Sequence, residues 1–144
     1  MKYRRFGDAI YIRVDKGEEI ITKILEVCKA ECIGSATFSG IGGLSEAQIQ
    51  TFIPEKGEFE TETVTGMLEL VSINGNIVTD EDMNYFYHAH SLVSYKDGDR
   101  HIVCGGHTKS LTVLYTGEIE LRPVTGGCIK RIYNPETGTG FWDL

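Results

Sequence analysis

The alternation of hydrophobic and polar residues predicts short strands along most of the chain and one helix near its start. Tyr3 to Val14 is expected to form two strands around the turn pair Gly7-Asp8, since Tyr11 to Val14 alternates in part between apolar and polar residues. A strand with this alternation has one face in the core and the other in solvent. The start of the chain is therefore predicted to be a pair of half-buried strands.

The only strong helix pattern follows Asp15. Its apolar residues recur at the 3.6-residue spacing of an amphipathic helix, and they are Ile20, Ile21, Ile24, Leu25, Val27, Cys28 and Cys32. Asp15 is expected to cap the helix, because Glu18 follows three residues later, the spacing of a capping box. Gly34 is expected to end it. Such a helix needs an apolar surface to cover, and the strands that follow can supply one.

Glycines divide the middle of the chain into predicted strands. Ala36 to Ile41 and Leu44 to Ile53 are expected to be two strands joined by a sharp bend in the glycine-rich segment Ser39 to Gly43, which ends with Gly42-Gly43. The next apolar strand leads into Asn74-Gly75, a strong hairpin signal. The chain is therefore predicted to turn back at this pair and return as Asn76 to Thr79.

A hairpin that carries histidines is predicted next. Tyr85 to Tyr95 is its first strand, Lys96 to Asp99 its turn and Arg100 to Cys104 its second strand. Gly105-Gly106 is expected to form a flexible corner, after which Leu111 to Arg122 forms a long alternating strand.

The end of the chain is unusually apolar. Phe141 to Leu144 is therefore expected to dock on the body of the protein or on a neighbouring subunit. Taken together, the patterns predict that residues 1–144 form one compact α+β domain. Its expected architecture is a mostly antiparallel, curved sheet with one main amphipathic helix packed on it.

The chain is acidic, which limits the partners that it can attract. It has 14 lysines and arginines against 21 aspartates and glutamates, a net charge of −7. Such a domain does not attract phosphate backbones by its overall field. No apolar run of about 18 residues exists, so no membrane span is expected, and the charged start lacks the apolar stretch of a signal peptide. The four cysteines are accordingly expected to be reduced thiols in a cytoplasmic protein.

The candidate chemistry lies in the histidine-bearing segment. His88 and His90 are two residues apart, so in a strand both side chains leave the same face. With His107 they can supply three imidazoles to one zinc ion and leave a fourth position open. His101 is a weaker candidate ligand, and Cys104 is a further one, three residues before His107. The alternative is that His88-x-His90 marks only a polar patch on an exposed strand.

Four motifs are weak alone but specific in combination. They are Ser39-Gly40-Ile41-Gly42, the segment from Gly66 to Asn76, His88-x-His90 and Gly105-Gly106-His107. Together they resemble the Plants and Prokaryotes Conserved domain family, also known as the PD1-like DNA-binding proteins, over nearly the whole chain. The resemblance implies a compact α+β fold that assembles as a homotrimer. In plant members the domain follows an AT-hook, which residues 1–144 do not contain, and single-domain members are labelled DNA-binding by analogy.

The resemblance also implies a metal site. Carried over by position, its ligands are His88, His90 and His107, and its cofactor is a divalent ion, with zinc first. Thr108 departs from the family pattern, which tends to have leucine after this histidine. This difference is expected to change the packing beside the site.

The function expected from the resemblance is that of a DNA-associated or regulatory module with weak DNA affinity of its own. A trimer would carry three times −7, that is −21, which opposes DNA binding. The alternative is a metal-dependent enzyme of the hydrolase or lyase type, or a small-ligand-binding protein, that uses the same histidines. Glu69 is the family-matched carboxylate for proton transfer, although a structural or ligand-holding ion is favoured over catalysis. A third interpretation is an assembly domain that recruits a protein partner.

Overall fold

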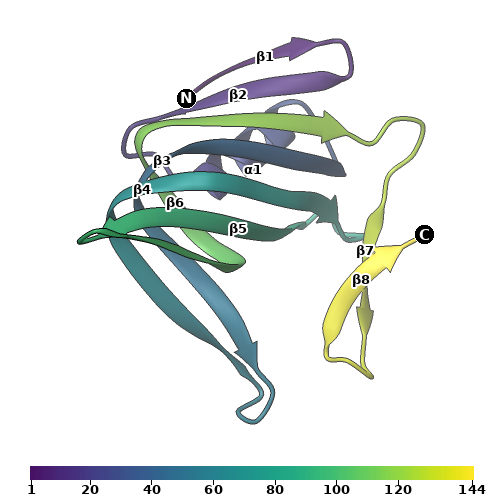
Figure 1. Ribbon diagram of the computed structural model, residues 1–144. Coiled ribbons are helices and arrows are strands. Elements are labelled where there is room, and N and C mark those ends of the chain that lie inside the picture. Colours follow the sequence, from purple (N-terminus) through teal and green to yellow (C-terminus); the bar gives the residue numbers. More distant parts are fainter.

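The computed structural model describes residues 1–144 and contains one helix and an eight-stranded sheet (Figure 1). The strands are β1 (Lys2–Phe6), β2 (Ala9–Asp15), β3 (Ala36–Ile53), β4 (Glu58–Thr79), β5 (Tyr85–Asp97), β6 (Arg100–Pro123), β7 (Lys130–Asn134) and β8 (Thr139–Asp143). The helix is α1 (Ile20–Ala30). The predicted α+β architecture, a mostly antiparallel sheet with a single helix, is confirmed.

The four longest strands form a closed ring of pairings. β3 pairs antiparallel with β4 and with β6, and β5 pairs antiparallel with the same two strands. β2 and then β1 extend the sheet beside β6 (Figure 1). α1 packs against β6 and β2. One continuous core of 25 buried residues joins the helix to the inner face of the sheet. No helix in the structure has the length and hydropathy of a membrane-crossing segment.

The predicted bend at Gly42-Gly43 is wrong, because β3 runs through it as one strand. The register of β3 against β4 shifts between Gly40 and Gly42 and again between Leu44 and Glu46. Such bulges bend a strand without ending it. A Cβ on Gly42 would lie 2.5 Å from the carbonyl oxygen of Thr116 on β6. The glycine therefore permits a close approach of two strands and makes no corner.

The hairpin predicted at Asn74-Gly75 is also wrong. Both residues lie inside β4 and pair with His90 and Ala89 of β5. A Cβ on Gly75 would lie 2.5 Å from Cζ of Phe38 and 2.7 Å from the carbonyl oxygen of His88. The glycine is thus required by packing beneath an aromatic ring. Asn74-Gly75 is typical of a turn, but here the glycine lies in the middle of a strand because no side chain fits at this position.

The helix forms where its apolar spacing predicts, but other residues cap it. Glu19 is the N-cap, and its carboxylate accepts from the backbone N–H of Ile21 at 3.0 Å and of Thr22 at 2.7 Å. The same carboxylate accepts from the backbone N–H of Leu111 at 3.1 Å, which ties the helix to β6. Asp15 is therefore not the cap, although its own N–H donates to Glu18 at 2.8 Å.

The C-terminus of α1 is likewise displaced from the predicted glycine. Cys32 takes the left-handed conformation, with φ of 54°. The N–H of Ile33 donates to the carbonyl oxygen of Cys28 at 2.8 Å, and that of Cys32 donates to Lys29 at 3.3 Å. This pair of bonds is the Schellman motif. The helix consequently ends before Gly34 is reached.

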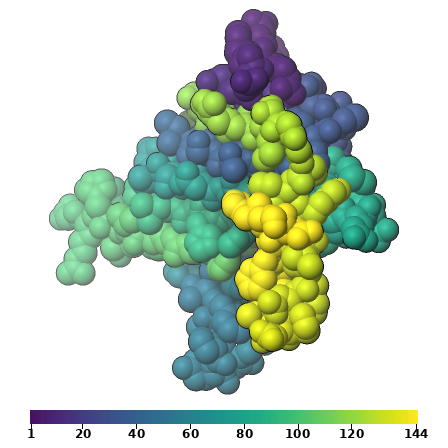
Figure 2. Space-filling view, turned by 90° about the vertical axis from the view of Figure 1, so that its right-hand side faces the viewer, coloured from purple at the N-terminus to yellow at the C-terminus, as the bar shows by residue number.

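The apolar tail forms β8 against β7 and contacts the body, but it stays largely in solvent, with Phe141 and Trp142 each 45% exposed and Leu144 93% exposed. The predicted docking on the body is therefore seen only in part. β7 and β8 pair antiparallel, and the hairpin joins the sheet through Thr79 of β4 and Lys130 of β7. The indole Nε1 of Trp142 donates to Oδ1 of Asn76 on β4 at 3.3 Å. In Figure 2 this hairpin, in yellow, lies in front of the body.

The four thiols of the chain are expected to differ in reactivity. Cys28 is buried, and burial raises the pKa of its thiol to about 12, whereas Cys32 and Cys128 are exposed. Because the thiolate is the reactive form, a disulfide reagent at neutral pH should modify Cys32 and Cys128 first. Cys28 should react only after unfolding, and Cys32→Ser and Cys128→Ser variants assign the fast phases. A Cys28 that reacts in the folded protein as fast as Cys32 would contradict the packing described here.

Candidate metal centre

Three histidines project from one face of two paired strands. His88 and His90 are on β5, two residues apart, as the strand period requires. His107 is on β6 and is the direct antiparallel partner of His90. Directly opposed residues on antiparallel strands place their side chains on the same face. The register of β5 and β6 therefore brings the third imidazole to the other two.

The geometry of the three rings suits one metal ion. One ligand nitrogen from each ring lies within 4.8 Å of the others. Nε2 of His88 and Nε2 of His90 are 3.3 Å apart. A tetrahedral zinc ion with nitrogen ligands at about 2.0–2.1 Å separates those nitrogens by about 3.3 Å. The donor set, three imidazoles with no thiolate, also fits zinc.

The corner predicted at Gly105-Gly106 is wrong, and the correction makes the site more rigid. β6 runs without interruption through both glycines. A Cβ on Gly105 would collide with the carbonyl oxygen of Ser91, and one on Gly106 would lie 2.8 Å from that of Gln50. His107 pairs with His90 on one side and with Gln50 on the other. The third histidine is thus held by two ladders of strand pairing.

Neither weaker ligand candidate joins the centre. His101 pairs with Lys96 near the turn of the β5–β6 hairpin, six residues before His107, or about 20 Å along the strand. Cys104 pairs with the buried Val93 and packs against the core. Because it lies an odd number of residues from His107, its thiol leaves the opposite face of β6.

Glu69 does not lie beside the histidines either. It pairs with Ser94 of β5, whereas Asn74 of the same strand β4 pairs with His90. Five residues of strand separate Glu69 from Asn74, which is about 16 Å. The carboxylate suggested by the family pattern is therefore out of reach of a ligand at the three histidines.

The surroundings of His88 and His107 favour their neutral forms. Partial loss of water around its ring lowers the pKa of His88, and the neighbouring His90 lowers it further. Burial also lowers the pKa of His107, followed by the effects of His90 and His88. The ring of Phe59 packs edge-on against His107, with 5.0 Å between centroids, and supplies part of that burial. Neutral imidazoles carry the lone pairs that a metal ion needs.

A buried polar pair supports the strands beneath the centre. The hydroxyl of Thr108 donates to Oγ of Ser91 at 3.0 Å, and both residues are buried. Each is the chain neighbour of a candidate ligand, since Ser91 follows His90 and Thr108 follows His107. Thr108, where the resemblance favours leucine, thus forms a buried hydrogen bond beside the candidate ligands.

A groove of about 980 Å³ opens beside the centre. His88 and His107 lie in its lining, Phe52 and Phe59 line it from the tips of β3 and β4, and Thr137 to Trp142 line it from the C-terminal hairpin. Arg131 is the only lysine, arginine, aspartate or glutamate in its lining. Sequence reasoning missed this wall, because β7 and β8 lie far from the histidines along the chain.

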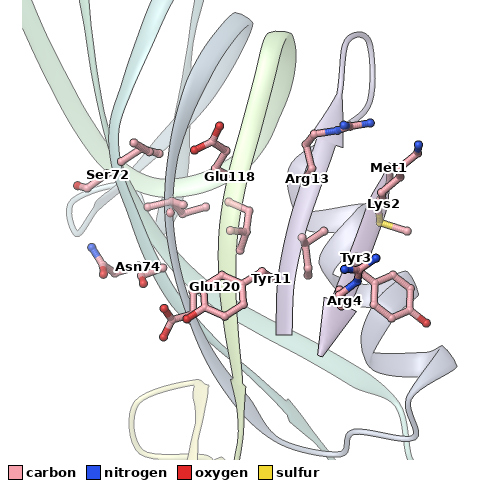
Figure 3. Close-up of a pocket in the computed structure, with 16 residues that line it drawn as sticks. Met1, Lys2, Tyr3, Arg4, Tyr11, Arg13, Ser72, Asn74, Glu118 and Glu120 are labelled. Atoms are coloured by element: carbon pink, nitrogen blue, oxygen red, sulfur yellow. The ribbon is translucent and has the colours of Figure 1, made fainter. Parts of the chain in front are cut away.

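A larger hollow of about 1110 Å³ lies elsewhere on the sheet, across β1, β2, β6, β3 and β4 (Figure 3). It carries charges of both signs, positive on β1 and β2 and negative on β6, and Arg13 lies opposite Glu118 in the strand register. It contains no histidine or cysteine. Its size alone therefore does not make it the better candidate for chemistry.

Comparison with known proteins finds one family and several similar structures. The family model of the Plants and Prokaryotes Conserved (PCC) domain matches residues 1–125. No curated protein matches the chain.

Three crystal structures are similar over nearly the whole chain. One is a plant- and prokaryote-conserved (PPC) protein from Pyrococcus horikoshii, with 33% identity, a TM-score of 0.82 and coverage of 99% of this chain and 94% of that one. A metal-containing protein from Archaeoglobus fulgidus has 29% identity and a TM-score of 0.82, with 100% and 99% covered. A "putative DNA binding protein" from Bacteroides thetaiotaomicron has 25% identity and a TM-score of 0.89, with 99% and 96% covered.

Proposed function

Because the chain belongs to the Plants and Prokaryotes Conserved (PCC) domain family, we propose that it is a regulatory binding module that forms a homotrimer and holds one divalent metal ion at His88, His90 and His107. The observation that carries the proposal is the convergence of three ligand nitrogens within 4.8 Å of one another. The similar protein from Archaeoglobus fulgidus is described as metal-containing, which supports the same view. Zinc is the ion that fits the donor set best.

Binding is favoured over catalysis at this centre. Three imidazoles leave a fourth position on zinc for water or a ligand, and a bound ion would lower the pKa of such a water. A hydrolase or lyase also needs a group that moves a proton. The groove lining contains no aspartate or glutamate, and Glu69 lies about 16 Å along the sheet from the partner of His90. The groove therefore suits a protein that holds a small ligand better than one that transforms it.

DNA affinity is expected to be weak, in spite of the description that several similar structures carry. The net charge is −7 per chain, and affinity for the phosphate backbone comes from cations. With a labelled duplex at about 0.15 M salt, we expect a dissociation constant no tighter than about 10⁻⁴ M, the weak end of non-specific binding. Fluorescence anisotropy measures it. A nanomolar complex that prefers one sequence over a scrambled duplex would overturn this part of the proposal.

Self-association is expected from the apolar side chains that the outer face of the sheet leaves in solvent. Tyr115 is 67% exposed and Met67 46% exposed, and both lie over Gly43. Exposed apolar clusters of this kind mark interaction surfaces. Light scattering at micromolar concentration should give three times 16.0 kDa, that is 48.0 kDa. A mass of one chain under these conditions would contradict the trimer.

A further inference from the structure

The groove beside the three histidines has an unusual charge for so acidic a protein. The chain carries 21 aspartates and glutamates, yet none lines the groove, and Arg131 supplies its one side-chain charge outside the histidines. A metal ion at His88 and His107 would add a second positive centre in the same lining. A cavity with cationic groups and no acid is complementary to an anion.

The guanidinium of Arg131 is held in place but has no partner. Its Cζ lies 4.4 Å from the centroid of the Phe86 ring. The guanidinium also lies against Gly140 of β8, where an added Cβ would collide with it. Packing of this kind uses the flat face of a guanidinium and leaves its N–H edges free.

Arg131 is the one arginine that is both half-buried and unpaired, since Arg4 and Arg100 also lack a carboxylate partner but are exposed. Arg5, Arg13 and Arg122 each pair with a carboxylate. The half-buried Arg131 has no carboxylate within 4.0 Å and donates no side-chain hydrogen bond inside the chain. Its N–H fork matches the two oxygens of a carboxylate. A pre-positioned, unpaired guanidinium in a groove is therefore suited to a carboxylate ligand.

Aromatic side chains form two walls of the groove. Phe52 and Phe59 pack edge-to-face, with 5.3 Å between centroids, and form one wall. Trp142 forms part of another wall, and its Nε1 hydrogen bond to Asn76 at 3.3 Å holds it to β4. Flat apolar groups pack well against such rings.

We propose that the groove binds a small organic carboxylate with a flat, apolar body, whose carboxylate pairs with Arg131 and whose body lies between the aromatic walls. The inference deepens the proposed function by naming a ligand class for the same site. It rests on the proposed function in one respect only, the positive charge that a bound metal ion would add to the groove. Pairing with Arg131 needs no metal, so the two can be tested apart.

The test uses 2-naphthoate as probe and the single tryptophan of the chain, Trp142, as reporter. Titrations are run on the full chain, both metal-free after chelation and loaded with zinc. We expect saturable quenching, with an affinity that Arg131→Gln lowers at least about tenfold, since hydrogen bonds to charged groups contribute about 1.5–3 kcal/mol. Arg100→Gln, which removes an equal charge at the turn of the β5–β6 hairpin, should leave the affinity unchanged.

A neutral analogue, 2-naphthalenemethanol, separates the carboxylate from the apolar body. Arg131→Gln should weaken naphthoate but not the alcohol, and Gly140→Ala, which displaces the guanidinium, should do the same. The proposal would be overturned if Arg131→Gln lowered the affinity for both probes equally or left the affinity for naphthoate unchanged. It would also be overturned if naphthoate showed no saturable binding. The proposal is supported if naphthoate binds the metal-free protein with an affinity that depends on Arg131. The same affinity should persist when the three histidines are replaced, and this result supports the proposal even if the protein holds no zinc.

Discussion

Replacing His88, His90 and His107 together by alanine is expected to reduce the metal content of the purified protein from about one ion per chain to none. A metal site can be built from histidine, cysteine, aspartate or glutamate side chains. The three imidazoles are the only set of three or more such side chains whose ligand atoms lie within 4.8 Å of one another. Loss of groups that merely orient metal ligands costs about 10–100-fold in affinity. Loss of the ligands themselves should cost more, and elemental analysis of dialysed protein measures the result.

The chain offers a matched control for this experiment. His101 is the fourth histidine and lies at the turn of the β5–β6 hairpin, so His101→Ala should retain the ion. The candidate ligands lie on the outer face, with His88 and His90 exposed. In metal-free buffer, where no bound ion stabilises the parent, the triple variant should therefore unfold at a similar denaturant concentration. Equal metal content in the parent and the triple variant would end the assignment of the site.

Gly75→Ala is expected to destabilise the protein by about 1–3 kcal/mol, the usual cost of overpacking a core. The new Cβ would lie 2.5 Å from Cζ of Phe38, 2.7 Å from the carbonyl oxygen of His88 and 2.8 Å from Cβ of Ala89. Two of these atoms belong to ordered strands and cannot move aside without disturbing β5. The midpoint of denaturant unfolding should therefore fall, and zinc affinity should weaken with it because His88 and His90 flank the displaced segment.

Gly127→Ala is the comparison for that variant. Gly127 has no heavy atom within 4 Å of an added Cβ and no positive φ, so its change should stay within about 0.5 kcal/mol. If both variants unfold at the same denaturant concentration as the parent, Gly75 is not packed beneath Phe38. The turn predicted from Asn74-Gly75 would then need to be reconsidered.

The sequence predicts the candidate site better than it predicts the path of the strands. The two-residue period alone places His88 and His90 on one face, and that holds for any register. The meeting of His107 with His90 depends on where the β5–β6 hairpin turns. The turn predicted over Lys96 to Asp99 is shorter in the structure, at residues 98–99, but it is centred close enough to keep the register. The position of the third candidate ligand thus follows from a local turn signal and regular pairing.

The errors in the path of the strands share one physical cause. Glycine is favoured both where the backbone turns and where a side chain would collide with a neighbour, and a single sequence does not separate the two. At Gly75 and Gly105 the second cause applies. A side chain at Gly75 would collide with Phe38 and the backbone of β5, and one at Gly105 would collide with Leu92 and the backbone of β5. The strands therefore run on where turns or corners were predicted.

The groove was not predictable, because its walls are joined only by tertiary packing. Arg131 comes 43 residues after His88 and has no local motif around it. Its place depends on the hairpin of β7 and β8 folding back onto β4, which the apolar tail indicates only in part. The long-range hydrogen bond between Trp142 and Asn76 records that docking, and no spacing along the chain predicts it.

The most direct test of the account is X-ray absorption at the zinc edge on the zinc-loaded protein. The three histidines predict a first shell of three imidazole nitrogens at about 2.0–2.1 Å and one further light ligand. The His88→Ala, His90→Ala and His107→Ala triple variant should bind no ion to measure, whereas His101→Ala should give the spectrum of the parent. A sulfur ligand at about 2.3 Å, or a shell of oxygens without imidazole scattering, would contradict the account.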